Sequence, residues 1–183
     1  TPLYSSAASD VYKRQIDAIL GWWDFPVSTV LPILRREYGA PGATLESTLR
    51  CEHKYWSRLE QARVVPEHVP PFRAFDPLAP DPLAGIDLPF PFWVKPAKSV
   101  ASYLGFEVRD ASDFAVALAA LRANIHRIAE PFDLILAHAE LPQEVAALGG
   151  RCCLAEATIS QGRQCTLEGW VHGGETTVYG VVD

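Results

Sequence analysis

The stretch FPFWVKPAKSVASYLGFEV at residues 90–108 decides the fold that the sequence predicts. Residues 92–95 form a short apolar run that Pro96 ends, and residues 105–109 alternate apolar with charged side chains, so both are expected as strands. Nine residues separate them, more than the roughly two to five of a common hairpin loop. Loops of that length are often functional, so a strand, a functional loop and a second strand are predicted here.

The sequence on the C-terminal side continues with a helix and further strands. Ser112 is expected to cap a long helix, because apolar side chains recur at helical spacing after it, at Phe114, Leu118, Leu121, Ile125 and Ile128. Residues 154–156, 164–171 and 176–183 are expected as strands, and a glycine-bearing turn at residues 172–175 joins the last two.

The sequence on the N-terminal side is expected to be mainly helical. Residues 16–20 have the character of the end of a buried strand that stops at Gly21. Asp24 and Pro26 then favour the start of an amphipathic helix, and Gly39 ends it. A second helix is expected from Thr44, with a break around Cys51, and its buried face comprises Leu45, Leu49, Trp56 and Leu59.

Prolines are concentrated in one part of the chain. Nine of the fifteen lie between residues 66 and 96, and residues 76–91 are therefore expected as a linker or a long surface loop. Strands and helices on both sides of this segment indicate the α/β (α+β) class.

The composition excludes several classes of protein. The 183 residues carry a net charge of -6, which gives no basic surface for nucleic acid and no polybasic patch for a membrane. No run of about 18 apolar residues is present, so no membrane span is expected. The four cysteines form no CxxC pair, and they are expected as buried thiols of a cytoplasmic protein rather than as zinc ligands.

The first residues are expected to lie outside the folded protein. SSAASDVYKRQ at residues 5–15 resembles the translation of a transposon-end sequencing adapter, and the chain contains no methionine. Residues 1–15 are therefore interpreted as an artefactual leader, with a natural disordered tail as the alternative. Residues 16–183 are interpreted as an interior part of a longer protein.

Three motifs in order resemble the ATP-grasp superfamily of carboxylate-amine and carboxylate-thiol ligases. They are EHKYWSR at residues 52–58, preceded by GAPGATLES, the stretch at residues 90–108, and CLAEATISQGRQCTLEGWV at residues 153–171. The resemblance implies a partial ATP-grasp fold in several pieces: the end of an N-terminal α/β domain at residues 16–75, the linker at 76–91, a small α+β lid subdomain at 92–153, and the first strands of the core antiparallel sheet at 154–183.

Two lysines are the expected phosphate ligands. A triphosphate needs compact cations on flexible stems, which lysine supplies. The resemblance implies that Lys54 and Lys95 contact the phosphates of ATP from opposite walls of a cleft. It also makes residues 97–104 the lid over the phosphates, with Ser99 and Ser102 as donors. The lid departs from the family's glycine-rich pattern, since its first glycine is Gly105, and Lys98 is an alternative donor.

The third motif is expected to receive the nucleoside. The resemblance implies that Glu156 opens the hinge that holds adenine and that Ala157 and Ile159 supply backbone contacts to the base. Gln164 is the expected ribose ligand, with Arg163 as the alternative.

The resemblance also implies a chemistry. The parent protein is expected to use ATP and Mg²⁺ to phosphorylate a small-molecule carboxylate, so that an amine or another nucleophile attacks the acylphosphate. The magnesium ligands are expected beyond Asp183, and the 183-residue chain alone is expected to be inactive as a ligase. The alternatives are a noncatalytic nucleotide-binding or partner-binding domain, or an unrelated α/β domain. The sequence predicts no oligomeric state.

Overall fold

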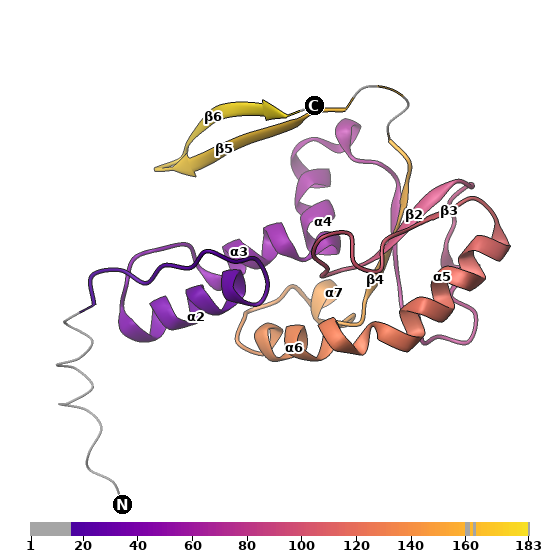
Figure 1. The fold of residues 1–183 in the computed structure, drawn as a ribbon, viewed down its shortest axis with the longest axis horizontal. Helices are drawn as coiled ribbons and strands as arrows, with labels where there is room; N and C mark the ends of the chain where they lie inside the picture. The colour runs from indigo at the N-terminus through magenta and orange to yellow at the C-terminus, as the bar shows by residue number, and fades with distance from the viewer. Residues whose placement is uncertain (1–15, 160–161, 163, 183) are drawn as a thin grey trace, which may run out of the picture.

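The computed structural model describes residues 16–159, 162 and 164–182, and it is a mixed helix and sheet structure (Figure 1). The helical segments are α2 (Val27–Tyr38), α3 (Leu45–Glu52), α4 (Lys54–Val64), η1 (Pro66–His68), η2 (Leu83–Gly85), α5 (Ala111–Asn124), α6 (His126–Leu136) and α7 (Gln143–Ala146). The strands are β1 (Phe72–Phe75), β2 (Phe92–Pro96), β3 (Phe106–Val108), β4 (Cys153–Ala157), β5 (Thr166–His172) and β6 (Glu175–Val182).

Four of these strands form one antiparallel sheet in the order β1-β4-β2-β3. The predicted strands at residues 92–95 and 105–109 are confirmed as the pair β2 and β3. β4 lies between β1 and β2, so a strand from late in the chain is hydrogen-bonded on both sides to earlier ones. This arrangement brings the third sequence motif next to the second.

The two faces of the sheet differ because side chains alternate along each strand. Phe92 and Val94 of β2 point to one face, where they join a buried cluster with Val108 and Ala155. Helix α5 covers this face with its own apolar side chains, which are Phe114, Ala117 and Leu121. Trp93 and Lys95 therefore point to the opposite face of the sheet, where they line a pocket together with residues of α4.

A second core lies among the helices. It contains Leu45 and Leu49 of α3, Trp56 of α4, and Phe132 of α6, all with little or no exposed surface. This cluster fixes α3 and α4 against α6, and α4 is in turn held against the sheet by the ring contact of Tyr55 with Phe72.

The expected break in the second helix is confirmed two residues later than predicted. Thr44 caps α3 by accepting a hydrogen bond from the backbone N–H of Ser47. His53 then takes an extended conformation, and its buried Nδ1 accepts a hydrogen bond from the backbone N–H of Trp56, which caps α4. Lys54 is consequently the first residue of a new helix.

The structure differs from the prediction at the N-terminal side. Residues 16–20 do not form a strand but an irregular segment, which Arg35 binds by donating two hydrogen bonds to the carbonyl oxygen of Ile19. β1, which was not predicted, follows the two prolines at positions 70 and 71 and precedes Pro77. Its four residues are a strand because β4 supplies the partner at an edge, where proline neighbours are tolerated.

The helices after β3 also differ in detail. Asp110, rather than Ser112, caps α5, accepting hydrogen bonds from the backbone N–H groups of Ser112 and Asp113. A carboxylate is favoured at this position because it also interacts with the positive end of the helix. The predicted long helix is two helices that meet at Ile125.

The proline-rich segment at residues 76–91 is irregular except for η2, as expected. It nevertheless packs on the molecule, because Ile86 belongs to the cluster under α5 and Leu83 and Leu88 lie against it. The division of the chain into an N-terminal domain, linker, lid and core therefore stays a proposal.

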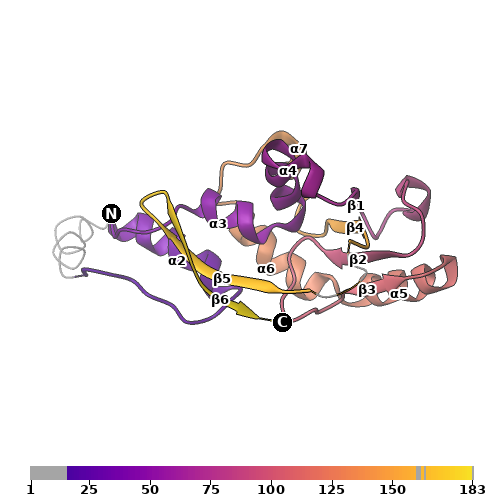
Figure 2. The same cartoon turned by 90° about the horizontal axis from the view of Figure 1, so that it is seen from above.

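The hairpin of β5 and β6 forms a sheet of its own, joined by a turn at Gly173 and Gly174. Both glycines have positive φ, as tight turns of this kind require. Figure 2 shows that the hairpin extends away from the four-stranded sheet, toward the end of the molecule that holds α2. The expected leader at residues 1–15, Arg163 and Asp183 lie outside the described residues.

Two of the four cysteines are buried and two are exposed. Cys152 and Cys153 are buried, as predicted, whereas Cys51 and Cys165 are exposed, since they lie on the outer side of α3 and just before the exposed hairpin. Within the described residues, no helix is both long enough and apolar enough to cross a membrane.

Candidate functional site

A cleft of about 440 Å³ lies where the sheet, the start of α4 and the loop between β2 and β3 meet. Its walls are formed by Lys54, Arg58, Trp93, Lys95, Ser99, Ser102, Gly105, Glu156, Ala157, Thr158 and Ile159. These residues come from all three sequence motifs. The pairing of β4 with β2 joins the second and third motifs, and the hydrogen bond from the backbone N–H of Lys54 to Ala97 joins the first to them.

Most of the residues that the sequence singled out line this cleft. They are Lys54, Lys95, Ser99, Ser102, Glu156, Ala157 and Ile159. Gln164 is the exception, since it is exposed and lies outside the cleft lining. Four further residues line the cleft but were not predicted as site residues, namely Arg58, Trp93, Gly105 and Thr158.

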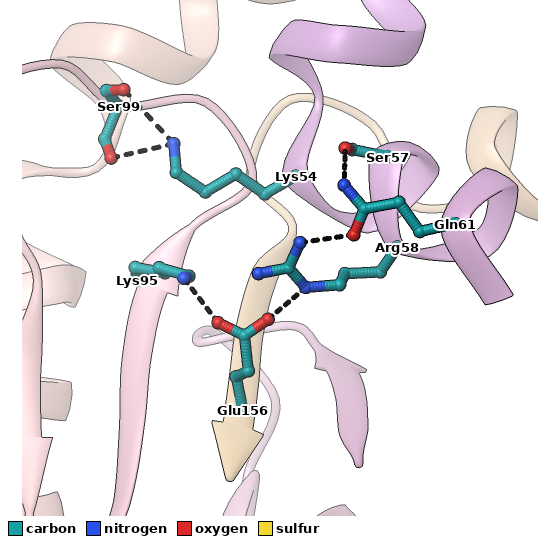
Figure 3. Close-up of polar contacts among 7 residues, drawn as sticks. All are labelled: Lys54, Ser57, Arg58, Gln61, Lys95, Ser99 and Glu156. Atoms are coloured by element: carbon teal, nitrogen blue, oxygen red, sulfur yellow. Dashed lines mark hydrogen bonds and ion pairs between the residues drawn. The ribbon is translucent and has the colours of Figure 1, made fainter. Parts of the chain in front are cut away.

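Lys54 joins α4 to the loop after β2. Its backbone N–H donates to the carbonyl oxygen of Ala97 at 2.8 Å, and its Nζ donates to the carbonyl and hydroxyl oxygens of Ser99 at 3.1 Å each (Figure 3). Burial lowers the pKa of Lys54 to about 8, and the nearby charges of Lys98 and Lys95 act in the same direction. This ammonium group is therefore held in place and close to losing its proton at neutral to mildly alkaline pH.

Glu156 lies at the centre of the charged groups. Oε2 accepts a hydrogen bond from Nζ of Lys95 at 2.5 Å, and Oε1 accepts one from Nε of Arg58 (Figure 3). Only 8% of its side chain is exposed. Burial acts to raise the pKa of Glu156, but the hydrogen bonds from Arg58 and Lys95 outweigh it, and the pKa lies below its usual value. The carboxylate is therefore charged at neutral pH.

Arg58 was missed although a sequence pattern could have found it. It follows Lys54 by four residues, so both side chains lie on one face of α4. Its Nη1 donates to Oε1 of Gln61 at 2.6 Å, and Nε2 of Gln61 donates to the hydroxyl of Ser57 at 3.3 Å (Figure 3). The guanidinium is thus oriented on its own helix before it reaches Glu156.

Lys98 does not reach the cleft, contrary to its expected role as an alternative lid donor. Its ammonium is buried, where it lies 2.6 Å from Oε2 of Glu52 and 3.2 Å from Oδ1 of Asp24. It also lies over the ring of Phe25, 5.3 Å from the centroid. These partners come from segments distant in sequence, and together they hold the base of the loop.

The loop itself turns without glycine. Ala101, Ser102 and Leu104 have φ angles of 48°, 58° and 57°, in the left-handed region that L residues seldom occupy. Each such residue costs on the order of 1 kcal/mol, so packing on the rest of the site must hold the loop in this shape.

Solved structures of ligases share the fold of this chain. The chain superposes on an L-amino acid ligase from Bacillus licheniformis with a TM-score of 0.63 and 20% identity, over 98% of this chain and 40% of that one. It also matches the D-alanine-D-alanine ligase from Helicobacter pylori, with a TM-score of 0.57 and 17% identity, over 84% and 40% of the two chains. The chain has a partial ATP-grasp fold.

A third solved structure agrees with this assignment. D-alanyl-alanine synthetase A from Vibrio cholerae matches with a TM-score of 0.57 and 15% identity, over 86% of this chain and 42% of that one. The chain thus spans about two fifths of the length of these ATP-grasp ligases. No family model and no curated protein matches the sequence.

The cleft of this ATP-grasp fold suits an anion with a flat apolar part. Its lining carries three cationic side chains, those of Lys54, Arg58 and Lys95, against the one carboxylate of Glu156. Trp93 and Ile159 add partly exposed apolar surface. The described residues contain no group of three or more His, Cys, Asp or Glu side chains that could hold a metal ion.

Proposed function

We propose that the cleft binds ATP and that the chain is the nucleotide-binding part of an ATP-dependent ligase. The observation that carries this proposal is the convergence of Lys54, Arg58 and Lys95 on one cleft around Glu156. Three cations against one carboxylate leave an excess of positive charge, which a polyphosphate neutralises. The ATP-grasp fold supports the same assignment.

The residues of the cleft suggest how ATP would lie. Lys54 and Lys95 would bind the phosphates, and the hydroxyls of Ser99 and Ser102 would add donors from the loop. Ala157 and Ile159 would offer backbone groups to the adenine edge. The ribose contact of Gln164 is also part of the proposal, although this residue stands outside the cleft lining.

The proposed reaction is the activation of a carboxylate. Bound ATP would supply the phosphoryl group of an acylphosphate, which an amine or another nucleophile then attacks. The matched structures are named as ligases of alanine or of L-amino acids, which favours a small-molecule carboxylate and an amine as substrates. The cationic side chains would hold the phosphates in place and offset their charge, which is the main task of a protein in phosphoryl transfer.

Magnesium and location belong to the same proposal. Mg²⁺ would accompany ATP, but the described residues supply no cluster of ligands for it, so no magnesium ligand is assigned among them. A cytoplasmic location is in keeping with free thiols at all four cysteines.

A noncatalytic nucleotide-binding or partner-binding domain is the second candidate. The loop between β2 and β3 favours it, because Ala101, Ser102 and Leu104 occupy left-handed conformations that glycine adopts without cost. Side chains at these positions would limit how closely the backbone approaches phosphates. Formation of ADP from ATP by the full-length parent protein, in the presence of amino acids, would favour the ligase over this candidate.

Calorimetric titration of the chain with MgATP tests nucleotide binding, which both candidates require. Saturable binding of ATP at one site is expected, and the intrinsic tryptophan fluorescence should change as the site fills, because Trp93 lines the cleft. Failure of ATP to bind at millimolar concentration would overturn the proposal.

A further inference from the structure

The carboxylate of Glu156 has two cationic partners that differ in chemistry. Its side chain is 8% exposed, and its two oxygens are divided between Arg58 and Lys95. A buried carboxylate is stable only when it is paired, and removing one partner of such a group is costly. Any change at Lys95 therefore affects Glu156, and the reverse holds as well.

If the cleft binds phosphates, the ammonium of Lys95 lies near two anions, the carboxylate of Glu156 and the phosphate. Its ammonium lies 2.5 Å from Oε2 of Glu156, yet it also lines the cleft in which a polyphosphate would lie. An anion that attracts Lys95 would leave Glu156 buried without a full counter-charge, unless another cation holds the carboxylate.

Arg58 meets that need. A guanidinium presents its donors in a fixed plane that matches the geometry of a carboxylate. Gln61 accepts from Nη1 at 2.6 Å and keeps the guanidinium directed at Glu156. The side chain of Arg58 is 22% exposed, so the bond to Glu156 is partly shielded from solvent.

We propose that Arg58 is a positioning residue, which holds Glu156 so that the ammonium of Lys95 can turn toward the phosphates of a bound nucleotide. The inference rests on the proposed function, since it assigns how that same cleft adjusts to its ligand. On this proposal, Arg58 raises the affinity for phosphate by holding Glu156, and not by direct contact with the phosphate alone.

A double-mutant cycle tests this dependence, with MgATP and adenosine as the probes. Arg58→Met removes the charge, and ATP affinity is expected to fall about tenfold, while adenosine affinity changes little. Glu156→Gln alone is expected to lower ATP affinity much less than Arg58→Met does, because Lys95 is then released. Adding Glu156→Gln to Arg58→Met is expected to restore most of the lost affinity.

Arg63→Met is the matched control, because Arg63 lies on the same helix, pairs with Glu60 and is 60% exposed. It is expected to bind ATP like the wild type. Circular dichroism and thermal unfolding establish that each variant folds.

Several outcomes would overturn the inference. One is an unchanged ATP affinity in Arg58→Met. Another is an equally low ATP affinity in Arg58→Met and in the double variant, which would mean that Arg58 acts only by direct contact with the nucleotide. If Arg58→Met fails to fold, the ATP affinity of the Glu156→Gln variant is the test. A tenfold loss of ATP affinity in Glu156→Gln contradicts the inference. Failure of the wild type to bind ATP would instead refute the proposed function.

Discussion

Lys54 and Ser99 are joined by two hydrogen bonds, from one ammonium group to the carbonyl and the hydroxyl oxygen of the serine, at 3.1 Å each. The two residues are 45 positions apart, and they connect the first turn of α4 to the loop that closes one side of the cleft. The position of the loop and the position of a main cationic group are therefore coupled.

The lowered pKa of Lys54 predicts that ATP binding weakens as the pH rises. With a pKa of about 8, the charged fraction of Lys54 falls from roughly nine-tenths at pH 7 to roughly one-tenth at pH 9. Affinity for ATP should fall several-fold over this range in calorimetric titrations. Lys54→Arg stays charged throughout, and its affinity should be nearly independent of pH. Equal pH dependence in both proteins would contradict the role of Lys54.

Lys95→Ala is expected to weaken ATP binding by more than about 1 kcal/mol, the scale of a hydrogen bond between charged groups. The variant removes one of the three cations that line the cleft, and Glu156 keeps its hydrogen bond from Arg58. Titration calorimetry with ATP measures the effect, and Arg127→Ala on the exposed side of α6 serves as the control. Unchanged affinity in Lys95→Ala would remove this lysine from the site.

His53 predicts a loss of stability in mild acid. Burial lowers its pKa in the folded protein to about 4, whereas an unfolded histidine titrates near its usual 6.5. The unfolded state therefore binds the proton first as the pH falls. The contribution of neutral His53 is fully present above pH 6.5 and is lost as the pH falls toward 4, by about 3 kcal/mol at about 1.4 kcal/mol per pKa unit.

Urea unfolding at pH 7 and pH 5 measures this effect. His53→Asn keeps an acceptor that can cap α4 but does not titrate, so its stability should change less between the two pH values. His68→Asn is the control, because His68 is exposed. A wild-type stability that does not fall between pH 7 and pH 5 would contradict the assignment of a buried neutral histidine.

Leu121→Ala should destabilise the fold by about 2–5 kcal/mol, the usual cost of such a cavity. Leu121 is fully buried between α5 and the sheet. Val116→Ala on the same helix should cost less than about 1 kcal/mol, because Val116 is 70% exposed. Similar unfolding midpoints for the two variants would show that α5 does not cover the sheet as described.

The elements that the sequence predicted well are those whose pattern is local. The apolar run up to Pro96 predicts β2, and the cap at Thr44 predicts α3. Gly39 and the apolar spacing predict α2, although Asp24 does not cap its start as expected. β1 could not be predicted in this way, since its four residues form a strand only because β4 lies beside them.

The same distinction applies to the cleft. Lys54, Lys95 and Glu156 could be selected because each belongs to a motif with a recognisable neighbourhood. The four-residue spacing from Lys54 places Arg58 on the same face of α4, but its bond to Glu156 spans 98 positions and depends on how α4 packs over the sheet, which no local pattern contains. The burial of the Lys98 side chain likewise depends on its ion pairs with Asp24 and Glu52, which come from two other segments.

The central claim is that the cations of this cleft bind the phosphates of a nucleotide. The most direct measurement is the ratio of the affinities for ATP and AMP, in the wild type and in the double variant Lys54→Met, Lys95→Met. The account predicts that the wild type binds ATP at least about tenfold more tightly than AMP, and that this preference is lost in the variant. A preference for ATP that persists in the double variant would contradict it.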